Sequence, residues 1–243
     1  MKQETFTILQ NDELAPGVFR LALRGLSPEI FPHPGQFVNI QLPGFFLRRP
    51  ISVCDAEGER LTLIYKLTGQ GTNALSGLKP GQKLDILAPL GRGYDLDKAG
   101  KAPVLLGGGA GIPPLYYLAK RLIAAGTRPG VLLGFNSASE LFYEKEFAAL
   151  GADVSVTTLD GSTGKKGFVT DHLPSGATFF YACGPLPMLK ALCRATALPG
   201  QLSLEERMGC GFGACMGCSI ETEMGPMRVC KDGPVFERQV LGW

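Results

Sequence analysis

The sequence of 243 residues is long enough for two compact domains, and a hydrophobic fraction of 45% can fill their cores. A formal net charge of +2, with no block of Lys and Arg interleaved with aromatic residues, argues against nucleic acid as a partner. No apolar run reaches the length of a membrane span, and seven cysteines without a signal peptide indicate a reducing cytoplasm.

Residues 1–98 show the alternation of hydrophobic and polar residues that is typical of a small barrel or sandwich. The expected strands surround Phe6 and Ile8 and cover residues 18–23, 37–42, 61–66 and 83–87. A break is expected at Asn11-Asp12, and one helical turn at 71–76 with Thr72 or Asn73 as its N-cap. We therefore predict a β-barrel domain for this part of the chain.

From residue 99 to residue 200 strands and helices alternate on a short period, which is typical of a parallel α/β sheet. The expected strands cover residues 103–106, 131–135, 154–157 and 179–183. The expected helices run from about 113 to 125, from a capping box at 137–140 to 150, and from about 185 to 197. This pattern predicts an α/β nucleotide-binding domain.

A glycine-rich turn, Gly107–Gly111, follows the first strand of this domain and opens its first helix. Free N–H groups and a helix dipole at such a turn suit a phosphate or pyrophosphate. The turn is not a Walker A loop, since no Gly-Lys-Ser/Thr ends it, and Pro114 departs from the dinucleotide fingerprint. The alternative is a tight connection in which glycine only permits close packing.

The ends of two further strands also bear on a nucleotide site. No Arg or Lys follows the strand that ends at Phe135, which favours NAD over NADP, and no acidic residue stands there for a ribose unless Glu140 does so. Cys183 ends another strand, at the edge of a parallel sheet where ligands bind. Cys54 and Cys193 are interpreted as small buried hydrophobes.

The last part of the chain, residues 201–243, carries four cysteines in the spacing C-x4-C-x2-C-x11-C. They are Cys210, Cys215, Cys218 and Cys230. The first two gaps match the plant-type [2Fe-2S] pattern, and the glycines between the thiols free the backbone to wrap a cluster. A four-thiolate zinc site is the alternative, although structural zinc usually takes two separated pairs of close cysteines. A disulfide framework is a further, weaker alternative.

Taken in order, these motifs resemble the ferredoxin-NADP reductase superfamily. They are Arg49-Pro50-Ile51-Ser52, Tyr65-Lys66, Gly71-Thr72, Gly107–Pro114 and Cys183-Gly184-Pro185. With the four-cysteine loop added in so short a chain, the sequence is closely similar to the electron-transfer subunits of class 1B dihydroorotate dehydrogenase. The resemblance covers essentially the whole chain. It implies a FAD-binding β-barrel domain at 1–98, an NAD-binding α/β parallel-sheet domain at 99–200 and a small C-terminal [2Fe-2S] module at 201–243.

The resemblance implies that one stretch holds both ends of FAD. Arg49 would bind the pyrophosphate, for which a guanidinium fork is suited, and Ser52 would hydrogen-bond the flavin ring near its reactive nitrogen. Pro50 and Ile51 lie between them as part of the same site. Ile51 stands where the superfamily often has tyrosine, so aromatic stacking on the flavin would come from elsewhere or be absent.

Two further stretches complete the implied FAD site, and a third faces NAD. Ile64, Tyr65 and Lys66 would line the flavin, while Gly71 and Thr72 would donate hydrogen bonds to phosphate. Gly109, Ala110 and Gly111 would face the nicotinamide dinucleotide. Cys183 would lie beside the nicotinamide and flavin rings as the catalytic residue that orients hydride transfer, and not as a nucleophile, because no base adjoins it.

In the resembling enzymes an FMN-containing catalytic subunit oxidises dihydroorotate to orotate in pyrimidine biosynthesis. Electrons would then pass through a [2Fe-2S] cluster on Cys210, Cys215, Cys218 and Cys230 to FAD, and finally to NAD⁺. The resemblance implies a heterotetramer with two copies of each subunit. We expect the cluster loop at the subunit interface, with apolar contacts from Met208, Phe212, Ala214 and Met216.

Two other functions stay open from the sequence. The same cofactors serve oxidoreductase subunits of other complexes, of the sulfhydrogenase, glutamate synthase-like or transhydrogenase type. Alternatively, the chain is a redox-sensing or scaffold protein that has kept the fold and cluster but lost catalysis. That function predicts a protein without flavin, or with a flavin that NADH cannot bleach.

Overall fold

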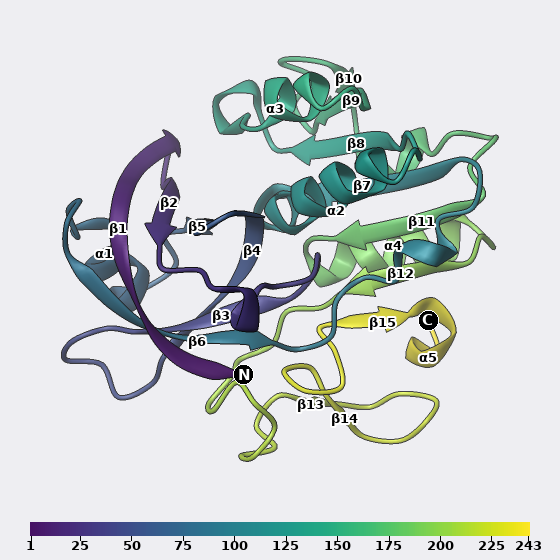
Figure 1. Ribbon diagram of the computed structural model, residues 1–243. Helices are drawn as coiled ribbons and strands as arrows, with labels where there is room; N and C mark the ends of the chain where they lie inside the picture. Colours follow the sequence, from purple (N-terminus) through teal and green to yellow (C-terminus); the bar gives the residue numbers. More distant parts are fainter.

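Two sheets organise the computed structural model, which describes residues 1–243 (Figure 1). The first is a closed barrel with strand order β1-β2-β5-β4-β3-β6, and every pair in it is antiparallel. The second has seven strands in the order β10-β9-β8-β7-β11-β12-β15, parallel except at β15. The predicted combination of a β-barrel and an α/β parallel sheet is confirmed.

The barrel contains all the strands predicted for it and one more. Its elements are β1 (Lys2–Ala15), β2 (Val18–Arg24), η1 (Pro28–Ile30), β3 (Phe37–Gln41), β4 (Arg49–Glu57), β5 (Arg60–Lys66), α1 (Gln70–Ser76) and β6 (Lys83–Leu90). The expected break at Asn11-Asp12 is wrong, because both residues pair with β2 and bulges on either side absorb the irregularity. The additional strand is β4, which the alternation does not show because Pro50 interrupts it; the resemblance alone implied a strand that carries Arg49 and Ser52.

The expected N-cap of the short helix α1 is also wrong. The helix begins one residue earlier than predicted, with Gly69 as its N-cap. The hydroxyl of Thr72 lies inside the helix and accepts the N–H of Thr68 at 2.9 Å and that of Gly69 at 3.3 Å. Thr72 lies in the first turn of the helix, and its hydroxyl stabilises the residues that precede the helix.

The second sheet follows the predicted alternation. Its elements up to residue 195 are η2 (Leu96–Lys98), β7 (Pro103–Gly108), η3 (Gly109–Gly111), α2 (Ile112–Ala124), β8 (Gly130–Phe135), η4 (Ala138–Glu140), α3 (Glu144–Ala149), β9 (Asp153–Thr158), β10 (Lys165–Lys166), η5 (Val169–His172), β11 (Phe179–Cys183) and α4 (Leu186–Ala195). The helix expected from the capping box to residue 150 is wrong in its first half. Glu140 bonds Asn136 instead of closing a capping box, and Tyr143 takes a φ of 67° before α3 starts.

The C-terminal segment returns to the second sheet at both of its ends. Its elements are β12 (Gly200–Ser203), β13 (Ser219–Ile220), β14 (Met227–Arg228), β15 (Val235–Glu237) and α5 (Arg238–Leu241). β12 lies parallel to β11, and β15 pairs antiparallel with β12. The boundary predicted at residue 201 thus falls within a strand of the sheet, and the cysteine segment is an excursion below the barrel and sheet in Figure 1.

The two sheets share a hydrophobic core, which fixes their relative position. Cys54 and Ile64 of the barrel lie in the same cluster as Ile112 and Leu115 of α2. Above this core Lys120 of α2 donates to Asp55 at 3.0 Å and to Glu57 at 2.8 Å, both on β4. No helix combines the length and the apolar character needed to cross a bilayer.

Candidate functional site

The glycine turn and Cys183 meet at the carboxyl edge of the second sheet. A Cβ atom on Gly111 would lie 2.2 Å from the carbonyl oxygen of Cys183, so only glycine fits there. A Cβ on Gly108 would lie 2.6 Å from the sulfur of Met188, at the start of α4. The structure therefore places the end of the glycine turn, at Gly111, directly against the backbone of Cys183.

A cavity of about 720 Å³ opens at this edge. Gly108–Gly111, Gly184 and Pro185 line one side of it, Asn136 and Glu140 another, and Lys66 reaches it from the barrel. α2 begins directly after the glycine turn and α4 directly after Pro185, so the N-terminal ends of two helices adjoin the cavity. N–H groups at helix N-termini favour anionic groups, which suits the pyrophosphate of a dinucleotide.

Glu140 stands at the end of β8 on the wall of this cavity. Its carboxylate accepts hydrogen bonds from the side-chain amide of Asn136 at 3.1 and 2.9 Å and from the Asn136 backbone N–H at 3.3 Å. The sequence analysis named this residue as the one exception to the lack of an acidic group at this strand end. The chain forms only the short η4 here, and the Glu140 carboxylate bonds Asn136, the residue that follows β8.

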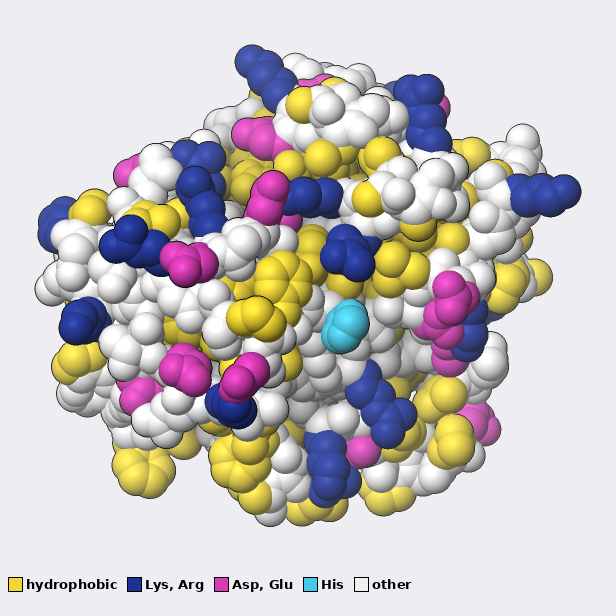
Figure 2. All heavy atoms as spheres, viewed as in Figure 1, with side chains coloured by type: hydrophobic (Ala, Val, Ile, Leu, Met, Phe, Trp, Pro, Cys, Tyr) yellow, Lys and Arg dark blue, Asp and Glu magenta, His cyan; other side chains and the backbone are white.

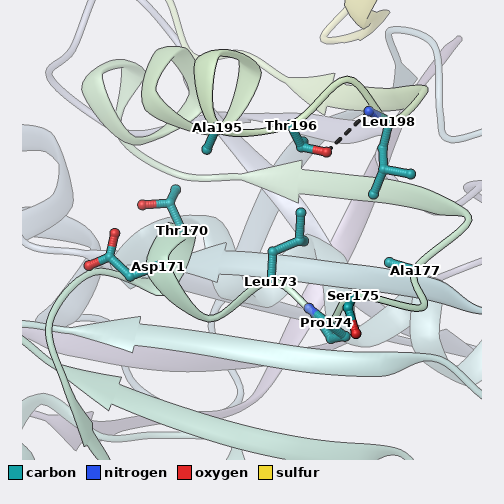
Figure 3. A pocket seen from close by; sticks show the side chains of 9 residues that line it. All are labelled: Thr170, Asp171, Leu173, Pro174, Ser175, Ala177, Ala195, Thr196 and Leu198. Atoms are coloured by element: carbon teal, nitrogen blue, oxygen red, sulfur yellow. Dashed lines mark hydrogen bonds between the residues drawn. The ribbon is translucent and has the colours of Figure 1, made fainter.

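A second cavity, of about 430 Å³, lies between η5 and the end of α4 (Figure 3). Thr170 and Asp171 line it from η5, and the Thr196 hydroxyl accepts the backbone N–H of Leu198 at 3.1 Å. No Lys or Arg and no glycine turn line this cavity. It offers nothing to a pyrophosphate, so the larger cavity is the candidate nucleotide site.

Cys183 is buried, with 2% of its side chain exposed. Burial, and then the nearby Glu205 carboxylate, raise the pKa of its thiol to about 12. A thiol of that pKa is protonated at neutral pH and is a poor nucleophile. The interpretation of Cys183 as a packing and orienting residue fits this environment. Glu205, which lines the cavity two residues after β12, is a site residue that the sequence analysis missed.

The first half of β4 has an open edge. Residues 49–52 pair with β3 on one side, but the ladder to β5 begins only at Val53. Arg48 forms an ion pair with Asp85 at 2.7 Å, whereas Arg49 has no carboxylate partner. The Arg49 guanidinium lies 4.8 Å from the centre of the Phe45 ring. The guanidinium otherwise donates only to the backbone carbonyls of Leu47 and Arg48, so it lacks a counter-charge, which fits the predicted pyrophosphate site.

Gly71 is held close to Arg49. A Cβ on Gly71 would lie 1.9 Å from Nε of Arg49, so this glycine lets the guanidinium approach α1. Arg49 and Gly71-Thr72, separated by some twenty residues in the chain, thus lie at one place as the sequence predicted.

The three residues expected to line the flavin take different positions. Lys66 lies on the cavity wall, and Ile64 lies in the core shared by the two sheets. Tyr65 is only 3% exposed; its ring stacks on Phe19 inside the barrel cluster, and its hydroxyl donates to Asn11 at 2.9 Å. Its side chain therefore supports the barrel, and a contact with the flavin would fall to its backbone.

The four cysteines of the C-terminal segment form two pairs. Cys215 and Ala214 donate backbone N–H bonds to the sulfur of Cys210 at 3.4 and 3.2 Å, and Cys210 donates one to the sulfur of Cys215 at 3.4 Å. Cys230 donates to the sulfur of Cys218 at 3.4 Å. Positive φ angles at Gly211, Gly213 and Met216 shape the loop between them.

Two pairs of thiols suit two metal ions better than one. A lone zinc ion would take all four thiols around one point, whereas the hydrogen bonds divide them into two pairs. All seven cysteines of the chain are free thiols in the structure. A [2Fe-2S] cluster takes two thiolates on each iron, and two neighbouring pairs provide that arrangement.

The thiols also differ in acidity. Burial opposes ionisation of Cys210, but N–H groups of Cys215, Phe212 and Ala214 outweigh it and lower the pKa of this thiol to about 6. Burial, and then the adjacent Cys218, raise the pKa of Cys230 to about 12. Metal binding requires the thiolate, which the N–H groups favour at Cys210 and burial opposes at Cys230.

The cysteine loop is tied to both sheets. Only five residues separate Glu205, on the cavity wall, from Cys210, so their Cα atoms lie within about 18 Å of each other. On the barrel side the amide of Asn39 on β3 donates to the Cys210 carbonyl oxygen at 3.1 Å. The sequence analysis missed Asn39, although an asparagine inside an apolar strand was a signal.

The cysteine loop also reaches the surface. Cys215 is exposed, and Phe212 and Met216 beside it are 44% and 53% exposed. Hydrophobic side chains interleave with Lys and Arg along the lower edge of the molecule in Figure 2, where the C-terminal segment runs in Figure 1. The pattern suits a contact surface over the loop.

Comparison with known proteins assigns both halves of this site. A family model described as the iron-sulfur cluster binding domain of dihydroorotate dehydrogenase B matches residues 205–241, and one described as an oxidoreductase NAD-binding domain matches residues 105–194. A chain from the solved structure of the NADH-dependent reduced ferredoxin-NADP oxidoreductase superposes with a TM-score of 0.88 at 30% identity, over 98% of this chain and 90% of that one. A ferredoxin NADP⁺ reductase from Neisseria gonorrhoeae, at 18% identity and a TM-score of 0.68 over 80% of this chain and 90% of that one, shares the fold.

Curated relatives extend the similarity over the full length. A protein from Geobacillus sp. (strain WCH70), named as the electron transfer subunit of dihydroorotate dehydrogenase B (NAD(+)), is 45% identical over 98% of this chain and 97% of its own. One of the same name from Bacillus cereus (strain B4264) is 42% identical over 97% of each chain. The chain therefore belongs to the family of dihydroorotate dehydrogenase B electron transfer subunits.

Proposed function

We propose that this chain passes electrons from an FMN-containing dihydroorotate dehydrogenase catalytic subunit to NAD⁺, through a [2Fe-2S] cluster and FAD. The observation that carries the proposal is the succession of three sites along one short path. A glycine turn faces Cys183, Arg49 lies without a carboxylate partner on an open strand edge, and the first of four paired cysteines follows Glu205 by five residues.

The cofactors divide the chemistry, since nicotinamide moves two electrons as a hydride, a cluster moves one electron, and flavin exchanges with both. The residues of the chain position and shield these groups. Arg49 and the Gly71-Thr72 turn would hold the FAD pyrophosphate, and Ser52 would bond the flavin ring from the half-buried start of β4. The Gly109–Gly111 turn would receive the NAD pyrophosphate, and Cys183 would close the sheet edge beneath both rings.

The two cysteine pairs would hold the cluster at the protein surface. Cys210 and Cys215 form the more accessible pair, while Cys218 and Cys230 are buried. N–H groups already directed at the sulfur of Cys210 would stabilise the negative charge of a thiolate-bound cluster. The exposed pair thus faces the side from which a donor would approach.

The partner is proposed to cover the cysteine loop. Phe212 and Met216 project from the loop with about half of their surface exposed, at 44% and 53%, and would be buried in such a contact with Met208 and Ala214. We place the assembly in the cytoplasm as a heterotetramer with two copies of each subunit, acting in pyrimidine biosynthesis. Free thiols at all seven cysteines suit a reducing compartment.

Anaerobic reconstitution with the FMN-containing subunit tests the function. We expect dihydroorotate-dependent reduction of NAD⁺ by the mixture and by neither subunit alone. Cys215→Ser should abolish this reaction while NADH-dependent dye reduction through FAD continues, and Cys193→Ser, a buried cysteine outside the site, should change neither. A mixture with full cofactor content that cannot reduce NAD⁺ with dihydroorotate would contradict the proposal.

A further inference from the structure

Asn39 occupies a position where an asparagine is unfavourable. It lies in the middle of β3 between Val38 and Ile40, which point into the barrel core. Asn39 points the other way, toward the C-terminal segment, and is only 1% exposed. Its side-chain oxygen has no hydrogen-bond partner. A buried polar group that is half satisfied costs stability, so its presence points to a role beyond folding.

The satisfied half of the amide holds a cluster ligand. Nδ2 donates to the backbone carbonyl oxygen of Cys210 at 3.1 Å, and no other side chain of the barrel forms a hydrogen bond to the cysteine loop. Gly211, with a φ of 81°, adds a second constraint, because a Cβ there would lie 2.4 Å from the same nitrogen. The cysteine loop therefore packs on β3 through the side-chain amide of Asn39.

The other neighbours of Asn39 belong to β4, the strand that carries the predicted FAD-binding residues Arg49–Ser52. Asn39 is paired with Pro50 in the ladder between β3 and β4, and its neighbours Ile40 and Val38 pair with Arg49 and Ile51. Arg48 donates to the backbone oxygen of Asn39 at 3.3 Å and is itself fixed by Asp85. The strand partner of Asn39 is therefore Pro50, which lies directly beside Arg49 in the stretch proposed to bind FAD.

We propose that Asn39 is a positioning residue for electron transfer between the cluster and the flavin. By holding the backbone of Cys210 against the strand pair that carries Arg49–Ser52, it would fix the position of this cluster ligand relative to the residues that hold FAD. The inference rests on the proposed function, since it assigns one residue to the step between two of its cofactors. Groups that orient a metal ligand typically change activity about 10–100-fold when removed.

The test uses the full chain with FAD and iron bound, mixed anaerobically with NADH. NADH is oxidised to NAD⁺, its two electrons and one proton pass to the flavin, and one of these electrons then reduces the cluster. In Asn39→Ala we expect flavin reduction to proceed as in the unmodified chain, while cluster reduction, followed by rapid-freeze EPR, slows about tenfold. The EPR line shape of the reduced cluster should also change, because Cys210 is no longer held.

Two further variants separate positioning from packing. Asn39→Asp keeps the shape but turns an acceptor toward the Cys210 carbonyl, and should slow cluster reduction at least as much as Asn39→Ala. Gln41→Ala is the matched control, because this amide lies on the same face of β3 but bonds Leu42 and Phe45 of its own loop. It should leave both phases and the EPR spectrum unchanged.

The outcomes decide between the two proposals. An unchanged rate and spectrum in Asn39→Ala with full iron content overturns the role of Asn39 alone. Loss of iron from both Asn39 variants, with iron retained in Gln41→Ala, also overturns it, since Asn39 would then hold the cluster and not its distance from the flavin. Absence of FAD or iron from the unmodified chain would instead contradict the proposed function.

Discussion

Single close approaches between residues set the geometry of the nucleotide site. Gly111 packs against the Cys183 carbonyl at a distance that excludes any side chain, and Gly71 leaves room for the Arg49 guanidinium. Each contact joins two sequence motifs that are far apart in the chain. These contacts explain why glycine is needed at these places in the structure, beyond the freedom it gives the backbone.

Gly111→Ala should therefore separate the glycine turn from the end of β11. Because the added Cβ would meet the Cys183 carbonyl oxygen at 2.2 Å, we expect a loss of about 1–3 kcal/mol in unfolding free energy and a raised KM for NADH. Chemical denaturation and steady-state dye reduction measure both quantities. Gly176→Ala, where no atom lies within 4 Å of the new Cβ, is the control and should change neither.

The position of Glu140 leads to a prediction about the preference for NADH over NADPH. Its carboxylate, on the cavity wall, would accept a ribose hydroxyl of NAD and repel the phosphate that NADP carries in its place. Glu140→Gln should reduce the preference for NADH over NADPH, measured as the ratio of kcat/KM, by about tenfold, the value of one charged hydrogen bond. An unchanged ratio would show that another group recognises the ribose.

The chemical types of these residues were predictable from the sequence, but their partners were not. The four cysteines were identified by their spacing, and Cys183 and the glycine turn by their places at the ends of predicted strands. Asn39, Glu140 and Glu205 were missed or left aside because their roles depend on which strand ends meet, which requires the tertiary fold. Tyr65 lies in an expected strand, but its side chain faces the barrel interior.

At the scale of elements, the start of α1 depends on hydrogen bonds to Thr72, a residue that the sequence analysis expected to be the N-cap. The Thr72 hydroxyl accepts the N–H of Thr68 and that of Gly69, which shapes the turn beside Arg49. Thr72→Val keeps the shape and removes these bonds, so we expect a loss of about 1 kcal/mol in unfolding free energy and weaker retention of FAD on gel filtration. Ser76→Ala, which removes a hydroxyl at the far end of α1, should keep FAD.

Periodicity located most elements but not all of them. Strands with clear alternation and helices with an apolar face were predicted close to their observed ends. β4 was missed because Pro50 interrupts its pattern, and β15 because three residues are too short to show a period. The C-terminal segment was therefore treated as separate from the sheet, although β12 and β15 anchor it there.

At the scale of the whole molecule, the barrel and the second sheet are joined by a shared core and by Lys120. The hydrogen bond from Lys120 holds the pKa of Glu57 below its ordinary value of 4.5. Because the folded-state pKa is depressed, this stabilisation is present above pH 4.5 and is lost as pH falls through the lower folded value. The ion pair stays partly exposed, so its contribution is at most about 1 kcal/mol.

Lys120→Met should therefore lower the unfolding free energy slightly at neutral pH, and the difference from the unmodified chain should shrink as the solution is acidified. Denaturant unfolding across a series of pH values measures this difference. Lys145→Met, at an exposed lysine of α3 without an ion pair, should show no such pH dependence. A difference that stays constant down to full protonation of Glu57 would assign the effect to packing.

The central claim is that one chain places a flavin between a nicotinamide site and an iron-sulfur cluster. The most direct measurement is iron and flavin analysis of the anaerobically purified chain, with visible and EPR spectra before and after NADH is added. The account predicts roughly two irons and one FAD per chain, and an EPR signal of a reduced [2Fe-2S] cluster after NADH. Zinc in place of iron, or a chain that retains no FAD, would contradict it.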